Sequence, residues 1–470
     1  MRQTWLATFI LLAPSLALAQ HPPASTAPLP APAVQLPDAP APDDAMLQPI
    51  QPAARSVASW DDALGYIRAR SVDLKIAQLE VARAEAQSRQ ALAGVLPTLT
   101  GSATGTHNFI TNTTSQISGL GAGGTPTFSQ VQSPNLNYAT GNLIVGMPLV
   151  VPRAWNALTT ASINENVARL SVEDAKRNIA LNVANAIVGA VTAERISELN
   201  RVGLKSALQR LDLTKRKNAL GAATGLDVIR ARQDVESARA TLITGDESVR
   251  QGREALGLAL GVAEAVGVAR GVDLDGIATL ALASCKPAAK LDERPDLAAA
   301  QLRVAVAHQG VRDVQAQFSP VLSAQSAIST TTIDTGASPS TTWNIQAVLS
   351  WSLWDGGNRY GLLRDTRALE DEAQQRFESL RRGAQVQIDQ ARRGVEVAEQ
   401  SRKVAADARA LAADTDRLTQ AGYVAGAGTS LELVSAAAAL RQAEIGLALQ
   451  EFTVVRAKLL AVLTLATCPW

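Results

Sequence analysis

The sequence predicts a mainly helical protein with a smaller β-barrel portion of the membrane type, built from two copies of one unit. Three observations support this fold class. One glycine-bearing turn occurs twice in the same frame, long proline-free stretches keep helical spacing, and several short stretches alternate between apolar and small polar residues. The repeat indicates two half-units of one architecture within the 470 residues, rather than a series of unrelated domains.

The repeated turn covers residues 221–231 and returns as residues 426–436. The matched pairs are Gly221 with Gly426, Thr224 with Thr429, Leu226 with Leu431, and Asp227 with Glu432. Each threonine is a suitable helix N-cap, and the acid three residues later completes a capping box. Each copy is therefore predicted to be a turn between a long helix and a second helix.

The N-terminus has the features of an export signal over residues 1–19. Arg2 supplies a positive end, an apolar core follows, and Ala17-Leu18-Ala19 forms a small-residue cleavage site before Gln20. Residues 20–56 are rich in proline and are predicted to be an extended tether. No later run of about 18 apolar residues is present, so no transmembrane helix is expected.

The composition excludes several classes of function. The 44 Lys and Arg residues balance 43 Asp and Glu residues, which gives no reason to expect a nucleic-acid partner. The three histidines are scattered without metal-ligand spacing, and no P-loop, nucleophile elbow or zinc motif is present. We therefore expect neither an enzyme nor a bound metal or cofactor.

Cys285 and Cys468 each follow one of the two predicted helical hairpins. In an oxidising compartment they could form a disulfide between the two halves, and two unrelated thiols are the alternative.

Four stretches are predicted to be strands. Residues 98–109 and 342–353 alternate regularly, residues 321–330 alternate more weakly, and residues 136–147 change phase, which a bulge near Gly141 would explain. Such strands match a barrel with lipid outside and water inside, and ordinary soluble hairpins would alternate in the same way. The export signal favours the membrane, as do three tryptophans that are candidate interface aromatics: Trp343, Trp351 and Trp354. Because four strands cannot close a useful barrel and open edges cannot sit in lipid, several chains must share one barrel.

Two stretches, 154–219 and 359–421, are predicted to be long helices that pack side by side as rods. The chain then divides into a first repeat over residues 57–270, a belt segment over 271–293, a second repeat over 294–466 and a tail over 467–470.

From residue 57 to 466 the chain resembles the TolC family of outer-membrane efflux proteins. The order helix, strand, strand, long helix, glycine turn, helix occurs twice, and local sequences support it. Asp61–Leu64 and Arg294–Leu297 resemble the family's helix starts, Trp354–Arg359 resembles its strand-to-helix corner, and the two glycine turns resemble its helical tips.

The resemblance implies a homotrimer in the outer membrane of a Gram-negative bacterium, with a shared twelve-stranded barrel and a helical tunnel in the periplasm. The expected function is a passive duct for efflux or type I secretion. A periplasmic adaptor (membrane fusion) protein and an inner-membrane pump of RND or ABC type would dock at the tips, through Gly221, Thr224, Leu226, Gly426, Thr429 and Leu431. A periplasmic coiled-coil adaptor is the alternative function, and an exported enzyme comes third.

The resemblance also implies a gate at the tips. Glu432 matches an acid that lines the entrance, where three like charges would attract cations and repel one another. Ser435 stands where the family often has a further acid, and Gly428 stands where some members have a bracing arginine. Tyr423 and Asp227 match positions that can hydrogen-bond between neighbouring hairpins, which predicts a latch. Helix capping alone is the alternative role for Asp227 and Glu432.

Overall fold

The computed structural model describes residues 42–109, 113–121, 123–132, 137–269, 285–287, 290–332 and 340–468. The predicted export signal, residues 20–41 of the predicted tether and most of the predicted belt segment lie outside this part of the chain. All described elements belong to the unit Ala41–Trp470.

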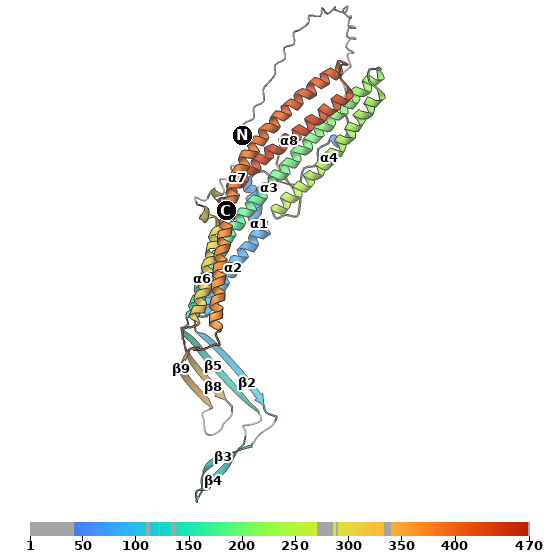
Figure 1. The fold of residues 1–470 in the computed structure, drawn as a ribbon. Helices are drawn as coiled ribbons and strands as arrows, with labels where there is room; N and C mark the ends of the chain where they lie inside the picture. The colour runs from blue at the N-terminus through green and yellow to red at the C-terminus, as the bar shows by residue number, and fades with distance from the viewer. Residues whose placement is uncertain are drawn as a thin grey trace, which may run out of the picture. The chain divides into compact units, whose positions relative to one another are not determined.

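The predicted order of elements occurs twice (Figure 1). The first repeat consists of α1 (Trp60–Arg70), α2 (Val72–Ala93), β2 (Thr98–His107), β5 (Asn137–Val150), α3 (Pro152–Ala219) and α4 (Gly225–Ala259). The second consists of α6 (Pro295–Ala316), β8 (Val321–Thr331), β9 (Thr341–Ser350), α7 (Asn358–Val424) and α8 (Ser430–Leu463). A hairpin that sequence periodicity did not predict, β3 (Thr113–Leu120) with β4 (Pro126–Gln132), lies in the chain between β2 and β5.

Local signals explain where the helices begin. Ser59 caps α1 by accepting a hydrogen bond of 3.2 Å from the Asp62 backbone N–H. Ser71 ends α1 and caps α2, with a 3.2 Å bond from the Leu74 N–H, so the first helix is divided in two. Pro152 opens α3 at a position where its missing N–H is no loss.

The long helices pack along one another. Helix α3 has 68 residues, about 100 Å at 1.5 Å per residue. It contacts α2, α4, α6 and α8, while α7 packs on α6 and α8. One stretch of α3 is apolar enough to cross a membrane by length and composition alone, a test that packed core helices also pass, and 44% of that stretch is buried inside the unit.

Four strands form one antiparallel sheet in the order β2-β5-β8-β9. Leu99 pairs with Val145, Val145 with Ser326, and Ser326 with Ile345. Because paired residues share a face, the register gathers the apolar side chains on one side. That face holds Leu99, Leu143, Val145, Met147, Leu322, Ile328, Trp343, Ile345 and Leu349.

The opposite face of the sheet is mainly polar. It carries Thr98, Thr100, Ser102, Asn142, Gln325, Ser329, Asn344 and Gln346. Asn142 bonds Ser329 at 2.7 Å and Gln325 bonds Gln346 at 3.0 Å. No Asp, Glu, Lys or Arg occurs in these four strands. The bulge predicted near Gly141 is wrong, because the pairing of β5 is continuous there and its irregularity lies between Pro148 and Val150. The alternation in the sequence changes phase because Ile144, an apolar residue, lies on the polar face.

The three candidate interface tryptophans lie on and just after β9. The Trp343 indole N–H donates to Ser326 Oγ at 2.9 Å, and that of Trp351 donates to the Phe318 carbonyl at 3.0 Å. All three rings are more than half exposed, as a lipid contact requires. Their role at a membrane surface stays a prediction.

The largest core cluster lies where the repeats meet. It joins α1, α3 and the ends of α4 and α8 through buried residues such as Trp60, Ile187, Leu256 and Leu463. Cys285 and Cys468 form a disulfide within this cluster and are fully buried. Short strand pairs surround it, with β1 (Arg55–Val57) parallel to β6 (Val266–Val268) and β7 (Lys286–Pro287) antiparallel to β10 (Ala466–Thr467).

Candidate functional site: the paired helical tips

The two repeated turns join α3 to α4 and α7 to α8. Each turn contains a glycine with positive φ, Gly221 at 74° and Gly426 at 82°, a conformation that strains other residues. We call residues 217–230 the first tip and residues 422–435 the second tip.

Both predicted capping boxes are confirmed. The Asp227 N–H donates to Thr224 Oγ1 at 3.3 Å, and Asp227 Oδ2 accepts from the Thr224 N–H at 2.8 Å. In the second tip the Glu432 N–H donates to Thr429 Oγ1 at 3.2 Å, and Glu432 accepts from the Thr429 N–H at 2.9 Å. Both acids therefore stabilise helix starts, whatever else they do.

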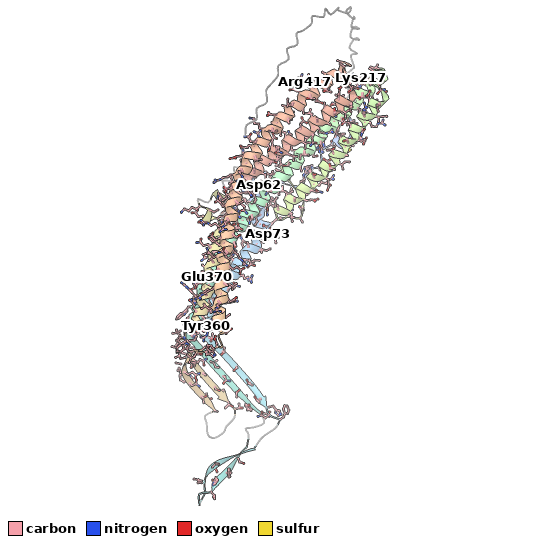
Figure 2. All side chains as sticks on the ribbon, in the orientation of Figure 1. Asp62, Asp73, Lys217, Tyr360, Glu370 and Arg417 are labelled. Atoms are coloured by element: carbon pink, nitrogen blue, oxygen red, sulfur yellow. A yellow bond between two sulfur atoms is a disulfide. The ribbon has the colours of Figure 1, made fainter. Side chains whose placement is uncertain are left out.

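Two contacts join the first tip to the second within one chain. Ser430, the first residue of α8, donates its hydroxyl hydrogen to Asp227 Oδ1. Lys217, near the end of α3, donates to the Tyr423 carbonyl oxygen and lies 3.4 Å from that of Val424. Figure 2 shows Lys217 beside the ends of the long helices.

Lys217 caps a helix other than its own. The residue is 7% exposed, and its ammonium group lies 4.2 Å from the centre of the Tyr423 ring. No carboxylate lies within ion-pair distance of it in the described chain, and its partners are the last carbonyls of α7 and the ring face. A cation is favourable at this negative end of a helix and over an aromatic ring. Burial lowers the pKa of Lys217.

The predicted hydrogen bond between Tyr423 and Asp227 is absent from the chain. The Asp227 carboxylate already accepts hydrogen bonds from the hydroxyl groups of Thr224 and Ser430, and the Arg230 guanidinium group lies 3.9 Å from it. The Ser430 hydroxyl and the Thr224 bonds lower the pKa of the Asp227 carboxyl. The Tyr423 hydroxyl is buried without a hydrogen-bond partner among the described residues, and its ring lies under Lys217.

Glu432 is exposed, and its bond to the Thr429 N–H lowers the pKa of its carboxyl. Ser435, one turn later, donates to the Glu432 carbonyl at 3.0 Å. At Gly428 a Cβ atom would lie 3.1 Å from the Tyr423 nitrogen, so the close approach of the backbone favours glycine there.

Leu226 and Leu431 are more than half exposed at the two tips.

Sequence reasoning found the acids of the tips but missed Lys217 and Ser430. A lysine in the last turn of a helix is a recognisable C-terminal signal. The sequence did not show that this lysine serves the end of α7 instead of α3, since that depends on how the hairpins pack.

A charge-free amphipathic sheet joined to two long helical hairpins is typical of a membrane protein with a helical extension. Comparison with known proteins gives the family. The outer membrane efflux protein family matches residues 63–262 and 287–459, so the chain belongs to this family.

Relatives in the family share modest identity with the chain. The toluene efflux pump outer membrane protein TtgC of Pseudomonas putida is 29% identical over 196 residues, which are 40% of each chain. Outer membrane protein OprJ of Pseudomonas aeruginosa is 28% identical over 64% of this chain and 61% of its own length. Nodulation protein T of Rhizobium leguminosarum bv. trifolii is 26% identical over 71% of this chain and 72% of its own.

Solved structures share the fold. CusC superposes with a TM-score of 0.74 at 20% identity, over 90% of this chain and 99% of CusC. VceC from Vibrio cholerae gives a TM-score of 0.70 at 20% identity, over 86% and 95% of the two chains. The resemblance to TolC-like efflux proteins is therefore confirmed. The chain is an outer-membrane protein of a family of efflux channels, and the family and its structural neighbours are transport proteins rather than enzymes.

Proposed function

We propose that the chain is one third of a trimeric outer-membrane channel, which carries substrates from an inner-membrane pump and a periplasmic adaptor to the cell exterior. The observation that carries this proposal is the sheet β2-β5-β8-β9. It has an apolar face, a polar face and, in the described chain, two edge strands with a single sheet neighbour each. Open edges are not tolerated in lipid, whereas twelve strands from three copies close a barrel.

The helical hairpins continue the passage into the periplasm. Rods of this length pack best beside other rods, so three chains would provide twelve helical stretches around one tunnel. The exposed Leu226 and Leu431 at the tips are suited to contact a helical adaptor, and a pump of RND or ABC type would supply the energy. A chain that was itself an adaptor would have no use for four charge-free amphipathic strands.

The proposed gate lies at the tips. Three copies of Glu432 near the axis would form a ring of negative charge that favours cations, and their repulsion would oppose closure. Asp227 and Tyr423 contribute to the gate through their contacts between the two tips. Asp227 accepts a hydrogen bond from Ser430, and the Tyr423 ring packs against Lys217.

The test uses protein extracted from the outer membrane in detergent. We expect a heat-resistant trimer on gels and discrete conductance steps in planar lipid bilayers. Glu432→Gln should lower the preference for K⁺ over Cl⁻ in reversal-potential measurements, while Glu451→Gln, which changes an exposed acid in the second half of α8, should not. A purified chain that is monomeric, soluble without detergent and electrically silent would contradict the proposal.

A further inference from the structure

The two contacts between the tips are not repeated by the internal symmetry of the chain. The alignment that places Gly221 on Gly426 also places Lys217 on Gly422 and Gly225 on Ser430. Lys217 and Ser430 each make a contact between tips. Their counterparts in the other repeat have no side chain with which to make it.

Packing within the chain does not require glycine at either counterpart. A Cβ atom on Gly225 would meet nothing within 4 Å, and one on Gly422 would meet only the Gly428 nitrogen at 4.0 Å. Neither residue has a positive φ. A Cβ atom therefore fits at both positions, so packing within the chain does not impose the asymmetry.

We propose that Lys217 and Ser430 are positioning residues that fasten the two tips of one chain together, so that the entrance opens between chains and not within a chain. This inference rests on the proposed trimeric channel. In a ring of three chains, first and second tips alternate. Each boundary within a chain has the lysine and the serine, whereas each boundary between chains, made by the same faces, presents Gly422 and Gly225 instead.

The same asymmetry separates the roles of the two tip acids. Asp227 accepts a hydrogen bond from Ser430 and so lies at the boundary between the two tips of one chain. Glu432, its counterpart, would face Gly225 of the next chain and keeps only its capping bonds. Asp227, hydrogen-bonded to Ser430, holds the two tips of one chain together. Glu432, which has no hydrogen bond to the other tip among the described residues, remains available to line the passage.

The experiment measures resting conductance of the trimer in planar bilayers. Lys217→Met should raise the resting conductance several-fold and add intermediate levels, because the tips of one chain then move separately. Lys217→Arg should restore the wild-type level, since a guanidinium can cap the same carbonyls. Lys215→Met, two residues away and exposed, is the matched control and should have no effect.

A gain of function tests the other half of the proposal. Gly225→Ser with Gly422→Lys would supply the missing contacts at the boundaries between chains, and should lower the resting conductance and make opening by voltage rarer.

Three results separate the possibilities. If Lys217→Met lowers the melting temperature but leaves the conductance unchanged, Lys217 only stabilises helix ends and the inference is overturned. An unaltered conductance in the double glycine variant, with trimers still formed, overturns it as well. A wild-type protein that never conducts removes the proposed channel itself, and is recognised without any variant.

Discussion

Asp44 accepts a hydrogen bond of 2.7 Å from Arg239 of α4 and fixes the N-terminal segment against the first helical hairpin. Asp44 also caps a short 3-10 helix, η1 (Ala45–Leu47), by accepting from the Met46 N–H at 2.9 Å. Met46 and Leu47 then pack on a buried cluster between α3 and α4, formed by Leu204, Ala207, Val235, Ala238 and Leu242. The end of the segment predicted as a tether is therefore part of the helical unit.

Asp44→Ala should destabilise the protein by about 1 kcal/mol, a value reduced from that of a buried charged hydrogen bond because the Arg239 side chain is 36% exposed. Asp43→Ala, an exposed neighbour, is the control, and thermal unfolding is the measurement. The Arg239 bond lowers the pKa of Asp44 from 3.8, so this contribution is present above pH 3.8 and disappears as the pH falls through the lower folded value. Equal melting temperatures for the two variants at pH 7 would contradict this assignment.

A buried ion cluster joins three of the long helices. Asp234 of α4 accepts hydrogen bonds of 3.2 and 2.6 Å from Arg210 of α3, and Arg441 of α8 lies 3.9 Å away. The Asp234 side chain is 3% exposed. The absence of a side chain at Gly203 makes room for Arg441, whose Cδ would lie 2.7 Å from a Cβ there.

Asp234→Ala should cost about 3–5 kcal/mol, because it leaves two arginines without their shared partner in a buried site. Asp414→Ala removes the acid of an exposed pair with Arg417 on α7 and should change stability by less than about 0.5 kcal/mol. Denaturant titration of both variants measures the difference. A small effect of Asp234→Ala would mean that water or another acid replaces the carboxylate.

The order of the elements could be predicted because its signals are local. The capping boxes at Thr224 and Thr429 and the proline at the start of α3 act within a few residues. The division between α1 and α2 at Ser71 is not marked by a proline or glycine, so sequence spacing alone does not reveal it.

The contacts of the tips could not be predicted in the same way. Lys217 and Tyr423 are far apart in the sequence, and either could have capped or packed on its own helix. The resemblance predicted a hydrogen bond from Tyr423 to Asp227. Within the chain, Ser430 donates to the Asp227 carboxylate instead, and the Lys217 ammonium group lies over the Tyr423 ring. Which side chain contacts Asp227 or Tyr423 depends on the relative positions of the two hairpins, and sequence periodicity does not predict those positions.

The two faces of the sheet should respond differently to charge. Ile345 and Gln346 are neighbours on β9, with Ile345 on the apolar face and Gln346 on the polar face. Ile345→Lys should reduce membrane insertion, at a cost of up to about 2–4 kcal/mol if the residue lies near the middle of the bilayer. Gln346→Lys should insert normally, because the proposed barrel turns the polar face of the sheet toward water. The yield of heat-resistant trimer in the outer membrane is the measurement, and the opposite ranking would reverse the assignment of the faces.

The disulfide encloses the whole second repeat, since Cys285 precedes α6 and Cys468 follows α8, 183 residues later. Closing so long a loop restricts the unfolded chain, and the loop-entropy argument gives up to about 5 kcal/mol. Cys285→Ser with Cys468→Ser should therefore lower the melting temperature and loosen β7 and β10, which pair beside the bridge. Because both sulfur atoms are buried, a reducing agent should act on the wild type only when the chain is partly unfolded, and should have no effect on the double variant. Thermal unfolding with and without reductant measures both effects, and equal melting temperatures for the two proteins without reductant would show that the bridge adds no stability.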